Sequence, residues 1–451
     1  MVLERREHPA KRGTALAAVA ALALVVSCSN RSETILPGER LDVRTGLTVG
    51  EAATPVGEDG PIARAFIPPP PQPVAAWTHR AGNPSHSIPH PALAASPSRI
   101  WSSDIGQGNN RKHRITADPV IADGRVFTID SRSLVTATST SGERLWTRSL
   151  VPETDNDGDA SGGGLAYSGG TIYATTGFGE VHALAAASGS EQWVQRLDAP
   201  ATASPTVAGG LVYVISRDNV AWAIDARNGR VRWNIPGRPS VSGMIGGAGP
   251  AVTDNMAVFP FASGEIVAAL RQGGVRQWGA TVSGGRKGRA YANVTDIVAD
   301  PVVANGVLYT GNQSGRAVAI DMETGTRLWT ADDGAYGPVW VAGDSVFLVS
   351  DEAELVRLDA GTGQTIWSQE LPYFKRARIN RRTAIYAHFG PVLAGGNLWV
   401  ASDDGTLTAY DPATGQTRQV LDLPSGAASN IAVAGNTLYV VTENGQLHAF
   451  R

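Results

Sequence analysis

The chain has 451 residues, which is long enough for one large single-core domain or for two to three small ones. Glycine is frequent, with 52 residues, whereas charged residues make up only 18% of the chain, a composition typical of all-β proteins with many tight turns. The formal net charge is −3, and the first 27 residues are net positive, so the remaining chain carries no net basic field. The composition therefore disfavours a nucleic-acid partner.

The first 27 residues have the parts of a secretory signal peptide, with a basic start followed by an apolar stretch over residues 14–26. That stretch is too short to span a bilayer of about 30 Å as a helix. It ends in Val25-Val26-Ser27-Cys28, which resembles the lipobox of bacterial lipoproteins, and Cys28 is the only cysteine of the chain. The resemblance implies cleavage before Cys28, acylation of its sulfur and amine, and a lipid anchor in the membrane. Ser29 in the next position implies the periplasmic face of the outer membrane. The alternatives are an ordinary secretory signal with a chance cysteine and a transmembrane anchor.

Residues 28–98 are rich in proline, which removes hydrogen-bond donors and stiffens an extended chain. We therefore expect a flexible tether that holds a folded domain away from a membrane. His79, His86 and His90 fall in this segment. We expect them to be solvated, with a metal cluster as the weaker alternative.

Two patterns recur along residues 99–451. A Gly-x-x-x-Trp motif occurs six times and a seventh copy ends in Gln419; the glycines are Gly142, Gly189, Gly229, Gly274, Gly325, Gly363 and Gly415. Two-residue turns rich in Gly, Asn and Asp separate apolar runs at eight places: 123–124, 169–170, 209–210, 254–255, 305–306, 343–344, 395–396 and 435–436. Four short strands in each repeat of roughly 44 residues are typical of one propeller blade.

The last repeat lacks its outermost strand, because the chain stops at Arg451 directly after the apolar run 446–450. Residues 100–105, which include Trp101, have the form of an outer strand and precede the first repeat. The sequence thus predicts an all-β, eight-bladed β-propeller over residues 99–451, closed by its N-terminal strand. We expect the repeated tryptophans to pack between neighbouring blades.

The motif Ala-x-Asp-x-x-x-Gly-x-x-x-Trp at 223–233 and 319–329 is the tryptophan-docking repeat of the pyrroloquinoline-quinone dehydrogenase propellers. Those enzymes resemble one another in a vicinal cysteine pair that covers the quinone and in a calcium-bound active site. Here the only cysteine is Cys28, which lies outside the ring, so the cysteine pair is absent. The acidic run 155–159 resembles the start of a calcium loop, but the position that needs a bidentate Glu is Ala166. His113, His182, His388 and His448 lie in different repeats or their connectors, without metal-ligand spacing. We therefore predict no catalytic residues, no metal and no cofactor.

The combination of lipobox, Pro-rich segment and quinoprotein-like blades resembles the BamB family, lipoproteins of the outer-membrane β-barrel assembly machine. Four phrases carry the resemblance: residues 36–40, 101–106, 162–166 and 176–181. It covers essentially the whole chain after the signal peptide. It implies a non-catalytic scaffold that docks on a POTRA domain of BamA, contacts other subunits of the machine, and helps to deliver or insert unfolded outer-membrane proteins. The alternative is a quinone-dependent dehydrogenase-like enzyme, or a ligand sensor that uses the propeller channel.

In this family two neighbouring inter-blade connectors carry the docking residues, and here they correspond to residues 235–249 and 282–300. Both are long, and long loops on a rigid scaffold are common binding sites. Where the family has Leu-x-Leu-Arg-Gly, the first connector has Ser242 in the first position, keeps apolar character at Met244, and has Ile245 in place of the arginine. In the second connector, Asp296 matches the first aspartate of an Asp-Val-Asp motif, whereas Val298 stands at the second. The predicted partner-binding residues are Ser242, Met244, Ile245, Asn293 and Asp296. The basic run 375–382 is a further candidate for contact with anionic lipid or an acidic partner, unless it is only a solvated loop.

Overall fold

The computed structural model describes residues 64–201, 203–240, 243–244, 246–282, 284–286 and 294–451. The signal peptide and Cys28 lie outside these ranges. None of the helices found in the described ranges is long and apolar enough to cross a membrane.

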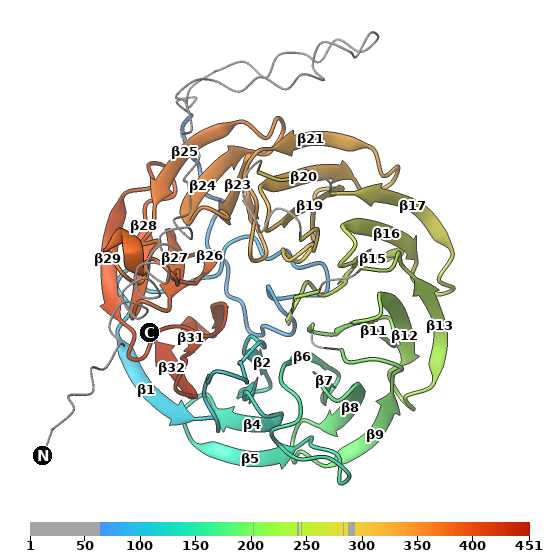
Figure 1. Cartoon of the computed structure of the whole chain (residues 1–451). Helices are drawn as coiled ribbons and strands as arrows, with labels where there is room; N and C mark the ends of the chain where they lie inside the picture. Colours follow the sequence, from blue (N-terminus) through green and yellow to red (C-terminus); the bar gives the residue numbers. More distant parts are fainter. Residues whose placement is uncertain (1–63, 202, 241–242, 245, 283, 287–293) are drawn as a thin grey trace, which may run out of the picture. The chain divides into compact units, whose positions relative to one another are not determined.

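The described residues form eight four-stranded antiparallel sheets arranged as a ring (Figure 1). The strands of the first four blades are β2 (Val120–Ala122), β3 (Arg125–Ile129), β4 (Leu134–Ser139), β5 (Arg144–Ser149); β6 (Gly163–Ser168), β7 (Thr171–Thr176), β8 (Glu180–Ala185), β9 (Glu191–Arg196); β10 (Thr206–Ala208), β11 (Leu211–Ser216), β12 (Val220–Asp225), β13 (Val231–Pro236); and β14 (Ala251–Val252), β15 (Met256–Pro260), β16 (Glu265–Leu270), β17 (Arg276–Thr281).

Blades five to eight are β18 (Val302–Ala304), β19 (Val307–Asn312), β20 (Arg316–Asp321), β21 (Arg327–Ala331); β22 (Trp340–Ala342), β23 (Ser345–Val349), β24 (Glu354–Asp359), β25 (Thr365–Glu370); β26 (His388–Ala394), β27 (Asn397–Ser402), β28 (Thr406–Tyr410), β29 (Thr417–Asp422); and β30 (Ala432–Ala434), β31 (Thr437–Val441), β32 (Gln446–Phe450) with β1 (Arg99–Asp104). A short 3-10 helix, η3 (Ile379–Arg381), lies between β25 and β26.

The ring closes through its two chain ends, as the missing outer strand predicted. β1 pairs antiparallel with β32, and Trp101 lies opposite Ala449. Two backbone hydrogen bonds of 2.8 and 2.9 Å join Ser98 and Arg451 just beyond the strands. The fold class and the eight blades are therefore confirmed.

The innermost turns explain why Asn, Asp and Gly recur there. Asn305 and Gly306 both have positive φ, 52° and 79°. This conformation suits a two-residue hairpin turn whose twist matches the flanking strands.

The repeated tryptophans pack between blades, as predicted, and each lies against the motif glycine of the next blade. A Cβ atom added at any of the seven motif glycines would approach that indole to between 2.6 and 3.0 Å, so no larger residue fits. The indole N–H of Trp193, for example, donates to the Ala226 carbonyl of the next blade at 3.0 Å. This packing also explains why Gln419 stands where the other copies of the motif have a tryptophan. The eighth blade has no turn between β32 and its outer strand β1, and hence no glycine there against which an indole could pack.

Part of the segment before β1 differs from the prediction: residues 64–73 are mostly exposed, but most residues from 74 to 92 are buried or half-buried. In Figure 1 this blue segment crosses the centre of the ring. We call residues 72–92 the central plug. The side chain of Trp77 is 1% exposed, and its backbone exchanges two 2.8 Å hydrogen bonds with Ile121 of β2.

The central plug is hydrogen-bonded to every blade, next to the innermost turns. In the first blade, the plug is bonded to Ile121. In the second to eighth blades, in chain order, the donors to the plug are the amides of Tyr167, Val207, Val252 and Val303, the Trp340 indole, and the amides of Gly395 and Gly435. Most acceptors in the plug are backbone carbonyls, including those of Pro84, Pro89 and Pro91. Proline lacks an N–H but keeps its carbonyl, so a Pro-rich strand can accept hydrogen bonds from all sides.

The three plug histidines are buried, which corrects the expectation that they are solvated. His79 Nε2 accepts the Val207 N–H at 3.0 Å, His86 Nδ1 lies 2.9 Å from the Pro301 carbonyl, and His90 Nε2 accepts the Gly396 N–H at 2.9 Å. Each imidazole thus satisfies backbone groups. Within the described part of the chain, no three His, Cys, Asp or Glu side chains form a group that could hold a metal ion.

Candidate partner-binding surface

The two predicted docking connectors leave the same face of the ring, on either side of the fourth blade. The first joins β13 to β14 and the second joins β17 to β18. In a four-stranded antiparallel blade, these connectors lie at the opposite end from the innermost turns, where the plug is bound. Ser242, Ile245 and Asn293 lie outside the described residues. The surface is therefore described through Met244, Asp296 and their neighbours.

Met244 and Asp296 join the two connectors directly. The backbone N–H of Met244 donates a hydrogen bond to Oδ2 of Asp296. The Met244 side chain is 44% exposed, whereas Asp296 is only 4% exposed. Burial raises the pKa of Asp296, although the Met244 N–H opposes that rise. The buried Asp296 therefore holds the backbone of the first connector in place, whereas the side chain of Met244 is exposed to solvent.

A second set of hydrogen bonds and ion pairs links both connectors to the plug. Asp300 is fully buried; its Oδ1 accepts the Gly249 N–H at 2.7 Å, and its Oδ2 lies 2.9 Å from Nε of Arg80. Arg80 also donates to the Gly246 carbonyl at 3.3 Å and lies 3.3 Å from Asp118. One guanidinium from the plug thus pairs with two buried carboxylates and links them to the first connector.

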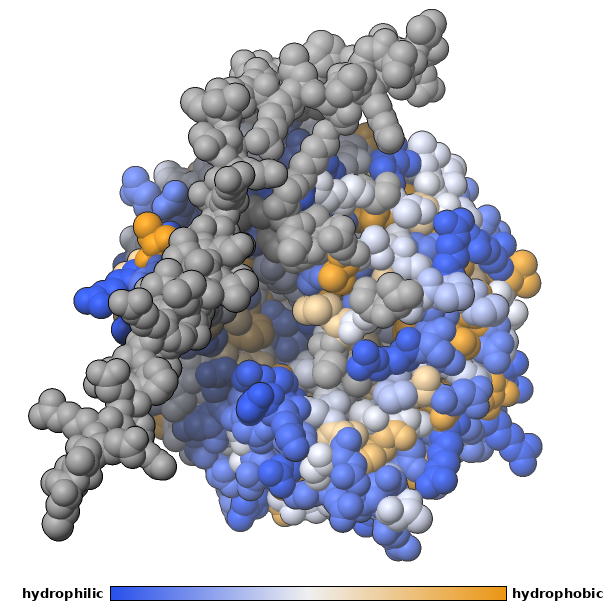
Figure 2. Space-filling model, in the orientation of Figure 1, coloured by the Kyte–Doolittle hydropathy of each residue, from blue (hydrophilic) through white to orange (hydrophobic). Residues whose placement is uncertain are grey.

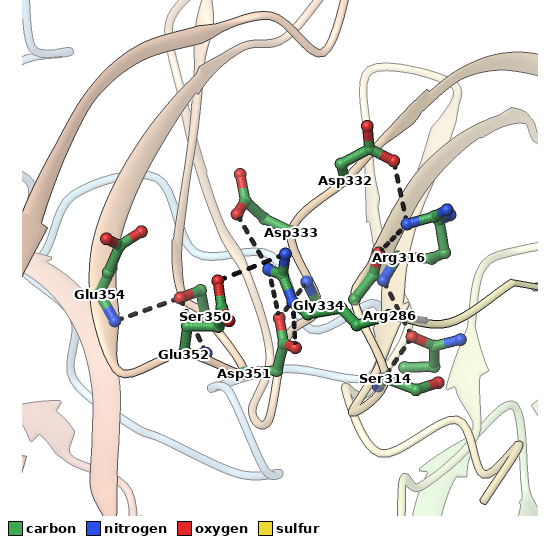
Figure 3. Close-up of polar contacts among 12 residues, drawn as sticks. Arg286, Ser314, Arg316, Asp332, Asp333, Gly334, Ser350, Asp351, Glu352 and Glu354 are labelled. Atoms are coloured by element: carbon green, nitrogen blue, oxygen red, sulfur yellow. Dashed lines mark hydrogen bonds and ion pairs between the residues drawn. The ribbon is translucent and has the colours of Figure 1, made fainter. Parts of the chain in front are cut away.

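Arg286 fixes the start of the second connector (Figure 3). Its guanidinium binds the buried Asp351 with two contacts of 2.8 and 3.1 Å, and also approaches Asp333 and Glu352. The hydrogen bonds with Asp351 raise the pKa of Arg286. Asp351 in turn accepts the Gly334 N–H at 2.8 Å. This network ties the second connector across the fifth blade to the sixth.

A cavity of ≈ 370 Å³ opens beside Met244 at the centre of the same face. Its walls include Tyr336, Tyr373, Ile385, Tyr386 and Phe389, and Arg80 of the plug contributes to its lining. Over the side of the molecule seen in Figure 2, hydrophobic residues are scattered among hydrophilic ones. The cavity thus offers a concentrated apolar contact on a mixed surface.

Sequence reasoning missed Arg80, Arg286, Asp300 and the cavity aromatics. A signal that the segment around Arg80 is buried was present, because Trp77 and Ile88 are large apolar residues in a Pro-rich stretch. Arg286 and Asp351 are 65 residues apart, and no local pattern relates them.

The other candidates for chemistry have structural partners. In the acidic run 155–159, Asp157 pairs with Arg132 at 2.7 Å and Asp159 accepts the Asn156 N–H at 2.9 Å. A quinone–calcium centre does not fit the residues present: the only cysteine is Cys28, and among the described residues the ring centre holds Arg80 between Asp118 and Asp300.

The fold and its repeats together define a class: an eight-bladed propeller of quinoprotein-like repeats, whose long inter-blade connectors form a candidate binding face. A family model described as "Outer membrane protein assembly factor BamB" matches residues 131–369 and 375–451, which is well over half of the chain. The chain therefore belongs to the BamB family of outer membrane protein assembly factors.

Individual relatives agree with this assignment. The chain is 26% identical to outer membrane protein assembly factor BamB of Yersinia pestis, over 79% of this chain and 89% of the relative. The Escherichia coli K12 protein of the same name is also 26% identical, over 78% and 88%. Both relatives carry the name of an assembly factor, which agrees with the prediction of a non-enzymatic protein.

Solved structures show the same fold. BamB from Moraxella catarrhalis superposes with a TM-score of 0.67 at 19% identity, over 79% of this chain and all of that one. Quinohemoprotein alcohol dehydrogenase from Comamonas testosteroni gives 0.62 at 16% identity, over 83% and 80%. The propeller is therefore shared with enzymes, so the fold alone does not assign a function.

Proposed function

We propose that this chain is a lipid-anchored, non-catalytic scaffold that supports outer-membrane protein assembly by docking on the periplasmic POTRA region of BamA. Family membership supports the assembly role. The lipobox-like Val25-Val26-Ser27-Cys28 supports attachment to the outer membrane through Cys28. The rigid ring presents binding connectors, and the anchor keeps them close to the membrane.

The observation that carries the docking proposal is the joint between the two connectors. The Met244 N–H is held by the buried Asp296, and the Met244 side chain remains exposed beside an apolar cavity. A preorganised apolar side chain at the centre of a face is the arrangement that a binding hot spot needs. In this proposal Met244 contacts the partner, and Asp296 positions Met244. Ser242, Ile245 and Asn293 lie outside the described residues, and we propose from the family resemblance that they also contribute to BamA binding.

The test is co-purification and a binding titration with the periplasmic region of the BamA homologue. Met244→Glu should weaken binding by about tenfold or more, because a charge replaces an apolar anchor. Asp296→Ala should weaken binding while Met244 itself is unchanged. Val420→Glu is the matched control, since Val420 is an exposed apolar residue on the outer strand β29.

Circular dichroism must show that all three variants are folded. Wild-type affinity in both folded Met244→Glu and Asp296→Ala would place the BamA contact elsewhere on the ring. An equal loss of affinity in Val420→Glu would show that a negative charge added anywhere on the ring weakens BamA binding, and that Met244 is not a specific contact.

A further inference from the structure

The connector between β25 and β26 forms a small hairpin on the binding face. We call residues 372–387 the basic hairpin. The Lys375 N–H donates to the Ala384 carbonyl at 3.0 Å, and the Tyr386 N–H donates to the Tyr373 carbonyl at 2.8 Å. The helix η3 lies at its tip. These bonds give the backbone of the hairpin a defined shape.

The hairpin concentrates positive charge on an otherwise acidic protein. Its sequence contains five cationic residues and no Asp or Glu: Lys375, Arg376, Arg378, Arg381 and Arg382. Lys375 pairs with Asp403, and Arg382 lies over the ring of Phe374 at 4.7 Å. Within the described ranges, no carboxylate pairs with Arg376, Arg378 or Arg381, and all three are exposed. Three guanidinium groups are thus directed to solvent with no described anion to neutralise them.

The same hairpin exposes apolar side chains and forms a wall of the cavity. Ile379 at the tip is 82% exposed, and Ile385 is also exposed. Tyr373, Ile385 and Tyr386 line the ≈ 370 Å³ cavity, and Met244 lines it as well. A volume of this size with apolar and aromatic walls and a few polar groups is typical of a ligand-binding pocket.

We propose that the basic hairpin and the cavity bind an extended acidic polypeptide segment that inserts an apolar or aromatic side chain into the cavity. The planar guanidinium groups of Arg376, Arg378 and Arg381 suit carboxylates, which they can bind through two parallel hydrogen bonds. The cavity wall formed by Tyr373 and Tyr386 suits an aromatic ring. This site shares the cavity lining at Met244 with the proposed BamA contact, whereas its arginines lie on a different connector.

A polypeptide fits these observations better than a lipid surface does. A membrane-inserting loop would place its apolar side chains together at the tip, yet only Ile379 lies there. Ile385 and the two tyrosines line the cavity instead. A side chain carried by an extended chain can enter such a cavity while its neighbouring carboxylates meet the arginines.

The test begins with an unbiased displayed-peptide selection on the mature, full-length protein. Wild-type protein should enrich peptides that combine Asp or Glu with Phe, Tyr, Trp or Leu. A synthetic labelled copy of the most enriched peptide then serves as the probe in fluorescence anisotropy. Arg376→Glu/Arg378→Glu/Arg381→Glu should weaken its binding at least about tenfold, and 0.5 M salt should weaken wild-type binding.

Two further variants separate charge from the cavity. Ile385→Asp should also weaken probe binding, because it places a carboxylate in the cavity wall. The control Arg144→Glu/Arg227→Glu/Arg230→Glu makes the same charge change on exposed arginines at or beside the turns of the opposite face, and should bind the probe like wild type.

The proposal is overturned if no acidic, apolar peptides are enriched, or if the hairpin triple variant binds the probe as wild type does. It is also overturned if the hairpin instead carries binding to phosphatidylglycerol vesicles, which flotation of the Cys28→Ser protein measures. Loss of probe binding with full retention of the BamA homologue supports this proposal and leaves the docking proposal intact. Loss of BamA binding in Met244→Glu alone tests the docking proposal separately.

Discussion

The indole of Trp77 stacks on the indole of Trp340, with ring centroids 6.3 Å apart and ring planes inclined by 15°. Trp77 belongs to the central plug and Trp340 to the innermost strand of the sixth blade. The Trp340 indole N–H also donates to the carbonyl of Pro89, another plug residue. The plug therefore belongs to the hydrophobic core of the propeller.

Trp77→Ala should lower the free energy of unfolding by about 3–5 kcal/mol, the usual range for a buried aromatic residue replaced by alanine. Chemical denaturation and thermal unfolding would measure this loss. Ile67→Ala is the control, because Ile67 lies in the same N-terminal segment but is exposed, and it should leave the midpoint almost unchanged. If Trp77→Ala unfolds like wild type, the plug does not contribute to the stability of the ring.

Because each repeated tryptophan packs against a motif glycine, a single methyl group added at such a glycine should strongly lower the free energy of unfolding. Gly229→Ala should be destabilising for two reasons: Gly229 has φ of +72°, and the new Cβ would lie 2.7 Å from the Trp193 ring. Gly124→Ala has nearly the same φ, +71°, but no atom within 4 Å of the new Cβ. The difference between the two unfolding free energies isolates the clash with the indole. Equal losses would show that backbone strain alone requires glycine in the motif.

His79 predicts a pH dependence of stability. Burial lowers the pKa of His79 to about 3, and protonation of Nε2 would also break its hydrogen bond from Val207. The unfolded chain binds a proton near pH 6.5 and the folded chain does not, so stability is complete above pH 6.5 and falls as the pH drops toward 3. His79→Gln should flatten the decline in melting temperature between pH 6.5 and 4. Only part of the slope should disappear, because burial also lowers the pKa of His448, to about 4. An unchanged slope would mean that the His79 imidazole does not titrate differently on folding.

The membrane anchor gives a prediction about Cys28. Three acyl chains on this residue would make membrane attachment effectively permanent, since each buried methylene contributes about 0.8 kcal/mol. Cys28→Ala should remove the lipid and release any processed protein into the periplasmic fraction. Mass spectrometry of the mature N-terminal peptide checks the assignment, and an unacylated wild-type cysteine would contradict it.

The sequence predicted the propeller because its determinants are local and repeated. Turns such as Asn305-Gly306 require residues that tolerate positive φ, and the Gly-x-x-x-Trp spacing places an indole in six of the outer strands. Ring closure was predictable for a related reason: Trp101 matches the outer strands and the last repeat lacks one.

Only the tertiary structure decided where the Pro-rich segment lies and what Asp296 does. The plug is held by hydrogen-bond donors from all eight blades, which are distributed along the sequence. A Pro-rich sequence pattern cannot distinguish carbonyls that are hydrated from carbonyls that accept hydrogen bonds from amides. Asp296 is bonded to the amide of Met244, 52 residues away, and its burial depends on how two connectors pack. Local chemistry thus fixes the repeating blade, whereas the burial of individual polar groups at the centre and on the binding face depends on long-range packing that no local pattern encodes.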